Sequence, residues 1–321
     1  MNRIHAFLFC LALCAACSSG FVIPDPVPGG NPGQGEDPSG GTGEESGEII
    51  DNPPQELKEG MLYADGNDEG TYALILARGY NIEAPDESGA HAQNPFRHIR
   101  QHTDAQLGRP VFDFYIHIQN DDDRGKTNIT DRQRNEIKTD GKSPAALVAQ
   151  EGETLRISWK FRLPEGMKTT TKFCHIHQLK GIDNSENTAD VGMPLITFTC
   201  RSLSSGKQQF QVIYNGRTED NTGNVNYGKA DLADFLGQWV TVTETVKFAK
   251  DGSYQLVIYR MSDGKQLVKA DVPHIDMWRN GTTGLRPKWG IYRSFGENRS
   301  LASELRDEVL NFADFYIEKL Q

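Results

Sequence analysis

Residues 154–162 read Thr-Leu-Arg-Ile-Ser-Trp-Lys-Phe-Arg, a run in which apolar and polar side chains alternate. A period of two is typical of a β-strand with one buried and one exposed face. The same alternation returns at 111–118, 194–200, 209–214, 239–248, 253–260 and 312–318. Turn sequences such as Asp140-Gly141 separate these runs. Many alternating strands joined by short turns predict an all-β fold, a jelly-roll sandwich of two antiparallel sheets.

Two regions interrupt this pattern. Residues 229–236 contain the one convincing helix start, a short turn before a strand. Residues 79–110 show little strand pattern and hold several His and Arg residues, so long loops beside a cleft are expected there.

The first 57 residues predict export and a tether. Residues 4–16 form an apolar stretch too short to span a bilayer, as in a signal peptide ending at residue 17. Small residues before Cys17 resemble a bacterial lipobox, in which Cys17 would be lipidated; an ordinary signal peptide cut nearby is the alternative. Residues 18–57 are rich in Gly, Pro and acids, with no Lys or Arg, and predict a disordered linker. The folded domain is therefore expected at 58–321, in the bacterial cell envelope by lipid anchor or secreted.

Charge and cysteine content restrict the function. The formal net charge is −10, most of it in the acidic linker, so the domain itself is nearly neutral. No large cationic field argues for nucleic acid. Three of the five cysteines lie in the signal, which leaves Cys174 and Cys200 either to pair or to be buried as small apolar groups.

The first polar segment is 131–138. Alternation in a strand places Arg132, Arg134, Glu136 and Lys138 on one face. Three cations around one carboxylate are costly to bury and suit the binding of an anion. A solvated outer strand with salt bridges would show the same pattern.

The second polar segment is 173–180, where His175 and His177 are expected on one face. Two adjacent imidazoles suit proton transfer or metal binding. A metal site needs a third ligand, which the nearby sequence does not supply. A pair of partly buried, hydrogen-bonded histidines is the alternative.

The third polar segment is 286–293, where Lys288, Gly290 and Tyr292 share a face. A glycine inside a strand often marks the close approach of a ligand or another backbone. Tyr292 could also be a half-buried packing residue. Together the three segments predict a sheet with an apolar core side and a polar, cationic side, which would suit an acidic polymer chain.

These segments resemble the three strand motifs of the alginate lyase family with a β-jelly roll: Arg-Ser-Glu-Leu-Arg, Gln-Ile-His and Lys-Ala-Gly-Val-Tyr. Residues 134–138 match the first, with Lys138 for the last Arg; 175–177 match the second, with His175 for Gln; and 288–292 match the third. The C-terminal part is also similar to heparin-lyase-type and glucuronan-lyase-type jelly rolls. The resemblance implies a concanavalin-like sandwich with a concave binding groove, and a polysaccharide lyase.

Such a lyase removes the C5 proton of a uronate and expels the O4 substituent. The resemblance implies that Arg134 neutralises the uronate carboxylate by a bidentate contact, helped by His175. His177 or Tyr292 would take the C5 proton, and Tyr292 would protonate the leaving oxygen. Glu136 would orient Arg134. The residues expected to line the substrate path are Arg132, Lys138, Lys180, Lys288 and a loop wall of Arg97, His98, Arg100 and His102.

Other functions give different signatures. A glycoside hydrolase needs two carboxylates flanking the bond, and a laminarinase-type Glu-x-Asp-x-x-Glu strand is absent. A binding module would present exposed aromatic residues, whereas the four tryptophans mostly occupy core-like positions. No cofactor is expected to be required, although residues 121–123, three aspartates, could bind structural calcium. The expected partners are an acidic polysaccharide and, only through the lipid anchor, a membrane; the protein is expected to be a monomer.

Overall fold

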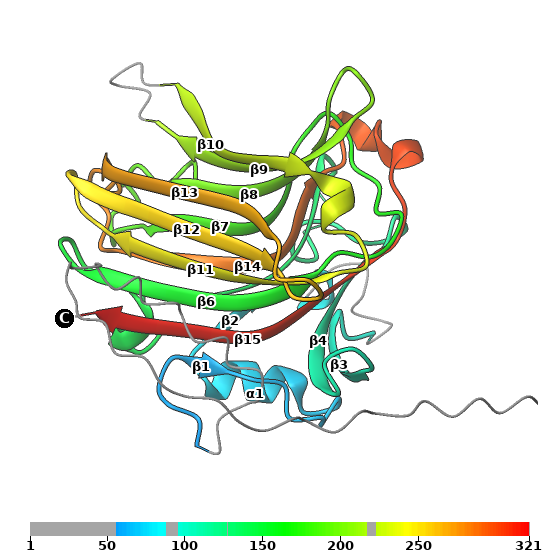
Figure 1. Cartoon of the computed structure of the whole chain (residues 1–321), viewed down its shortest axis with the longest axis horizontal. Helices are drawn as coiled ribbons and strands as arrows, with labels where there is room; N and C mark the ends of the chain where they lie inside the picture. Colours follow the sequence, from blue (N-terminus) through cyan, green and yellow to red (C-terminus); the bar gives the residue numbers. More distant parts are fainter. Residues whose placement is uncertain (1–55, 88–95, 127, 217–222, 321) are drawn as a thin grey trace, which may run out of the picture. The chain divides into compact units, whose positions relative to one another are not determined.

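Two antiparallel sheets form the fold in a computed structural model that describes residues 56–87, 96–126, 128–216 and 223–320 (Figure 1). In strand order, the eight-stranded sheet contains β13 (Gln266–Ile275), β12 (Gly252–Arg260), β11 (Trp239–Lys247), β6 (Thr154–Arg162), β15 (Glu308–Leu320), β4 (Arg109–Ile116) and β3 (Ile99–Asp104), with β1 (Met61–Leu62) beside β15. The predicted jelly-roll sandwich is confirmed.

The seven-stranded sheet carries all three polar segments singled out in the sequence. In strand order it contains β10 (Asn224–Asp231), β9 (Gln208–Asn215), β8 (Ile196–Ser202), β7 (Cys174–Ile182), β14 (Gly284–Ser294), β5 (Arg132–Lys138) and β2 (Asn81–Glu83). Three neighbouring strands, β7, β14 and β5, therefore bring together segments that are far apart in the sequence.

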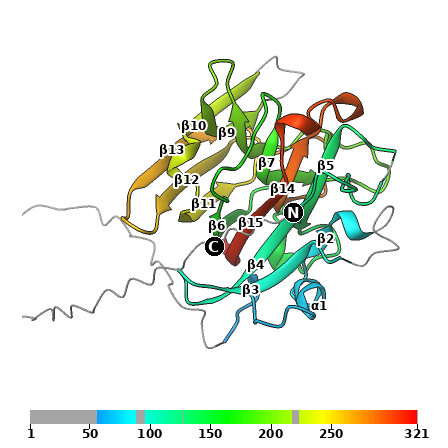
Figure 2. The ribbon, with the colours of Figure 1, turned by 90° about the vertical axis from the view of Figure 1, so that its right-hand side faces the viewer.

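Helices are few in the described part of the chain. The one α-helix, α1 (Thr71–Ala77), packs against β2 and β3 (Figure 2). The short 3-10 turns are η1 (Pro85–Glu87), η3 (Ala145–Leu147), η4 (Leu232–Asp234), η5 (Glu297–Arg299) and η6 (Ala302–Glu304). None of the helices described has the length and apolar character needed to cross a membrane.

Aromatic side chains fill the space between the sheets. Trp159 of β6 lies 5.8 Å from Phe198 of β8, and Trp289 of β14 lies 5.1 Å from Phe315 of β15, measured between ring centroids. These residues are no more than 1% exposed. Each large side chain removed from water contributes roughly 1.5–3 kcal/mol, so the two sheets hold each other in place through this layer.

The strands that carry the polar residues are irregular. The pairing of β7 with β8 shifts between His175 and His177, and that of β14 with β7 shifts between Trp289 and Tyr292. Such a bulge inserts one residue and reverses which side chains face the core. Gly290 adopts φ +141°, and a Cβ there would lie 2.1 Å from the carbonyl oxygen of Asn135. The glycine is therefore required by the close approach of β5.

Several expectations from the sequence are corrected here. The stretch 79–110 contains β2 and β3 as well as loops, because short edge strands leave little periodic signal. In the stretch 229–236, residues up to Asp231 continue β10, and only η4 follows. Cys174 and Cys200 are both buried as free thiols. Cys17, the export signal and nearly all of the linker lie outside the described residues, so those predictions stay untested.

Candidate active site

Arg134, Tyr292 and His175 lie in one row across three neighbouring strands. Tyr292 on β14 is the Cα partner of Arg134 on β5 and, on its other side, of His175 on β7. The side chains of these three residues also lie close to one another. The Arg134 guanidinium lies 3.7 Å from the centroid of the Tyr292 ring, and the His175 and Tyr292 centroids are 6.0 Å apart. We call the side of the seven-stranded sheet that carries this row the site face.

Two arginines surround Tyr292. Arg132 donates from Nη1 to the phenol oxygen at 2.9 Å, while its Nε and Nη2 bind Asp131. Arg134 covers the ring in a cation–π contact. The phenol oxygen therefore sits where negative charge developing on it would be stabilised.

His175 is held by a short relay of threonine hydroxyls. Its Nδ1 lies 2.7 Å from Thr199 Oγ1, and Thr199 in turn donates to Thr197 at 3.1 Å. Because the Thr199 hydroxyl donates its proton to Thr197, its oxygen accepts a hydrogen bond from Nδ1–H of His175. The neutral imidazole therefore carries its proton on Nδ1 and a lone pair on Nε2. Burial lowers the pKa of His175 to about 3, Glu136 opposes this shift, and Arg201 and Arg134 add to it. The imidazole is therefore neutral at pH 7.

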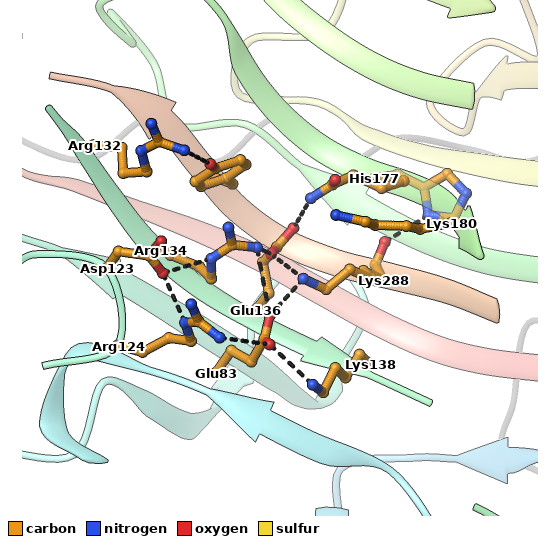
Figure 3. A network of polar contacts seen from close by, with 12 residues as sticks. Glu83, Asp123, Arg124, Arg132, Arg134, Glu136, Lys138, His177, Lys180 and Lys288 are labelled. Atoms are coloured by element: carbon orange, nitrogen blue, oxygen red, sulfur yellow. Dashed lines mark hydrogen bonds and ion pairs between the residues drawn. The ribbon is translucent and has the colours of Figure 1, made fainter. Parts of the chain in front are cut away.

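A network of charges adjoins the row (Figure 3). Arg134 donates from Nε to Asp123 at 2.8 Å and from Nη1 to Glu136 at 2.6 Å. Lys288 binds Glu136 at 2.9 Å and also contacts Glu83. A single carboxylate, Glu83, thus joins strands β2, β5 and β14 through its contacts with Lys138, Arg134 and Lys288.

Mutual attraction keeps this network charged despite its burial. Burial would raise the pKa of Glu83, but Lys288, Arg134 and Lys138 hold it well below its usual range. Burial would likewise raise the pKa of Glu136, which Lys288 and Arg134 keep low. Burial lowers the pKa of Lys288 to about 8, against the opposing effect of Glu136. Both carboxylates are ionised at neutral pH and committed to cations, so neither is available as a proton donor.

The predicted place of His177 on the site face is wrong. It is fully buried between the sheets, with Nδ1 2.8 Å from the Lys288 carbonyl oxygen and Nε2 2.9 Å from Glu244 Oε2. Trp159, Phe198 and Trp289 pack around its ring. The bulge after His175 explains the error, because regular alternation would have put both histidines on one face.

The same bulge brings Gln178 and Lys180 to the site face. Gln178, which the sequence analysis passed over, donates its amide to Glu136 Oε1. Glu83 was missed as well, because β2 is only three residues long and carries no alternating pattern. The expected contact of Glu136 with Arg134 is present. A bidentate grip by Arg134 is not available, since Nε and Nη1 are occupied and only Nη2 lacks a partner in the described part of the chain.

The predicted loop wall of Arg97, His98, Arg100 and His102 is also wrong. Arg100 and His102 belong to β3 in the other sheet, where they contact Asp68 and Asp113. Arg97 lies over the Tyr72 ring of α1 at 4.5 Å. His98 is buried, and although burial opposes it, hydrogen bonds to Asp121 and Asp86 raise its pKa to about 9. Strand β3 lies at the edge of the other sheet, and the contacts described here hold the four residues near that strand. They therefore do not cover the site face.

Residues 121–123 do not present one shared set of oxygens. Asp121 contacts His98 and His117, whereas Asp123 contacts Arg124 and Arg134. His98, His117 and Asp121 could by geometry hold a metal ion, but Asp121 already binds both rings. A pocket of about 460 Å³ contains none of the row residues and is lined by Ile118, Gln119, Asn120, Asp122, Ile129, Thr130 and Arg299. The chemistry is therefore assigned to the site face.

Comparison with known proteins identifies the class. The fold and the row define a jelly-roll enzyme of polysaccharide breakdown, and the polysaccharide lyase family model matches residues 104–310. The chain belongs to the polysaccharide lyase family. The match includes β5, β7 and β14, and with them all three residues of the row.

Two solved structures are similar to the chain. A crystal structure of alginate lyase A1-II′ is similar with a TM-score of 0.50 and 12% identity, covering 80% of this chain and 99% of that one. An endo-β-1,4-glucuronan lyase from the fungus Trichoderma reesei gives a TM-score of 0.46 and 12% identity, covering 74% and 94%. No curated protein sequence matches the chain.

Proposed function

We propose that the domain cleaves a uronic-acid polysaccharide by β-elimination at the row formed by Arg134, Tyr292 and His175. The observation that carries this proposal is the shared register of the three residues on adjacent strands, within the segment that matches the family model. A guanidinium, an imidazole and a phenol within one sugar-sized area supply charge neutralisation and proton transfer.

The first requirement is to make the C5 proton acidic. Arg134 covers the Tyr292 ring in the centre of the row, and its Nη2 is the donor left for a uronate carboxylate. A charge-assisted hydrogen bond from Nη2 stabilises the negative charge that spreads into the carboxylate as C5 loses its proton. Asp123 and Glu136 hold the guanidinium in place for this contact.

His175 is the proposed base. The threonine relay directs its Nε2 lone pair away from Thr199, where it can accept the C5 proton. Burial by itself makes the ring a weak base. A bound uronate brings a negative charge beside it, which favours the protonated imidazole and raises its pKa.

Tyr292 is the proposed acid. The electrons of the broken C5–H bond form the C4=C5 double bond, the C4–O4 bond breaks, and the leaving oxygen takes the phenol proton. Arg132 hydrogen-bonds the phenol oxygen and supports the charge that remains there. After product release, Tyr292 regains a proton and His175 loses one, so the enzyme returns to its starting state.

The test is a screen of the purified protein on alginate, glucuronan, heparin, chondroitin, ulvan and pectic substrates. The proposal requires an ultraviolet absorbance rise from the C4=C5 uronate on at least one of them. New reducing ends without that absorbance would indicate hydrolysis instead. Binding without cleavage would indicate the carbohydrate-binding alternative. The similarity to alginate and glucuronan lyases supports these two as the first substrates to try.

The location of the protein is a separate proposal. The signal-like residues 1–17 and the acidic stretch 18–57 support export, lipidation at Cys17 and a tether to a folded domain from residue 58. The domain is also proposed to be a monomer. Metabolic labelling with a radioactive fatty acid should mark the wild type and not Cys17→Ala.

Activity is proposed to need no cofactor, so that dialysis against a chelator leaves the rate unchanged. A lower melting temperature after dialysis would reveal structural calcium.

A further inference from the structure

A second cationic site lies on the same sheet, away from the row. Arg286 on β14 and Lys180 on β7 are direct Cα partners. Like charges placed opposite each other in a sheet repel, so this pair needs compensation. Burial and then the nearby Arg286 lower the pKa of Lys180. Burial also lowers the pKa of Arg286.

Among the described residues, no acid forms a direct ion pair with Arg286 or Lys180. The Nε and Nη1 atoms of Arg286 are buried without a hydrogen-bond partner in the described residues. Lys180 reaches only the carbonyl oxygen of Gly192, at 3.4 Å. The charges of Glu83 and Glu136 raise the pKa of Arg286, but both carboxylates are already bound by Lys288, Arg134 and Lys138.

The nearest remaining acid is also occupied. Asp140 follows β5 and affects the charge of Arg286. Its Oδ2 accepts from the Asn81 amide at 2.7 Å, and its Oδ1 accepts from the Lys142 backbone at 2.9 Å. Arg286 thus keeps unused guanidinium donors beside a second cation; its side chain is partly exposed, although Nε and Nη1 are buried.

We propose that Arg286 and Lys180 form a second carboxylate site, which binds a uronate of the chain other than the one that is cleaved. A guanidinium fork binds a planar carboxylate through two parallel hydrogen bonds, and an adjacent ammonium adds charge. Arg286 stands six residues from Tyr292 along β14, which corresponds to roughly 20 Å of strand. The site should therefore make the enzyme bind long substrate chains more tightly than short ones. The identity of its ligand rests on the proposed function.

The experiment uses Arg286→Gln and Lys180→Gln with size-defined oligouronates of the cleaved polysaccharide. For long oligomers, kcat/KM should fall roughly tenfold or more, through KM, because a charge-assisted contact is lost. For the shortest oligomer that is still cleaved, both parameters should stay unchanged. Arg286→Lys should restore part of the loss, since it keeps the charge without the fork.

Arg156→Gln is the matched control, because Arg156 lies on β6 in the other sheet and pairs with Glu318. Equal losses at every oligomer length, a loss confined to kcat, or no loss at all would each overturn the second site. Titration calorimetry of long oligouronates on Tyr292→Phe provides a readout without turnover. Binding that depends on Arg286, together with a wild-type protein that makes no unsaturated product from any substrate in the screen, would overturn the proposed function and leave this site standing.

Discussion

His177 and Glu244 join the two sheets through the core: Nε2 of the histidine on β7 lies 2.9 Å from Oε2 of the glutamate on β11, and both side chains are fully buried. Glu244 also accepts a hydrogen bond from Tyr254 at 2.7 Å. A buried pair of this kind contributes little net stability relative to apolar residues, but removing one partner leaves the other buried and uncompensated. His177 is therefore assigned to the fold, not the chemistry.

His177→Ala should lower the free energy of unfolding by about 3 kcal/mol or more, since it combines a cavity with the loss of a contact to the buried Glu244, which keeps only Tyr254. Urea denaturation followed by fluorescence measures this loss. Activity per folded molecule should stay within a few fold of the wild type at a temperature where the variant is folded. A stable His177→Ala protein without activity would return this residue to the catalytic mechanism.

His175→Ala should show the reverse behaviour. The side chain contacts Thr199 on the partly exposed site face, so its loss should change the melting temperature little. The rate should fall by about two to four orders of magnitude if His175 is the base. Steady-state kinetics on the best substrate, compared with His177→Ala, separates the two histidines. Retention of most of the rate in His175→Ala would contradict its assignment.

The sequence predicted the positions of the strands more accurately than the side of the sheet on which each side chain lies. The alternation in 154–162 and 239–248 marks central strands correctly, since those strands pair regularly over their whole length. It misplaced His177 because a bulge changes the alternation without leaving a recognisable residue pattern. Arg134 and Tyr292 came together as expected because β5 and β14 are in regular register. Glu83 could not be foreseen, since its role comes entirely from the docking of a three-residue strand.

Glu83→Gln should destabilise the protein in a pH-dependent way. The cations around Glu83 hold its folded-state pKa below the unfolded value of about 4.3. Its contribution is therefore fully present above that value and is lost as the pH falls through and below it. At pH 7 the loss should be about 3 kcal/mol, as for a broken buried pair.

Thermal melts from pH 7 to pH 3 test this relation. The melting temperatures of wild type and Glu83→Gln should differ most at neutral pH and approach each other in acid. Lys319→Gln is the control, because Lys319 belongs to a partly exposed pair with Glu153, far less buried than Glu83 and its partners. A difference that stays constant over the whole range would show that the Glu83 charge is not what stabilises the strands.

Tyr292→Phe should keep the fold and lose nearly all activity. Phenylalanine preserves the ring on which Arg134 packs, so the melting temperature should change little, but no proton can be given to the leaving oxygen. The remaining turnover should depend on the leaving group: a substrate with an electron-poor O4 substituent needs less protonation and should be impaired less than the natural polymer. Arg134→Ala offers the contrast, because without carboxylate neutralisation it should fail on both substrates. Equal impairment of Tyr292→Phe on the two substrates would remove Tyr292 from the role of acid.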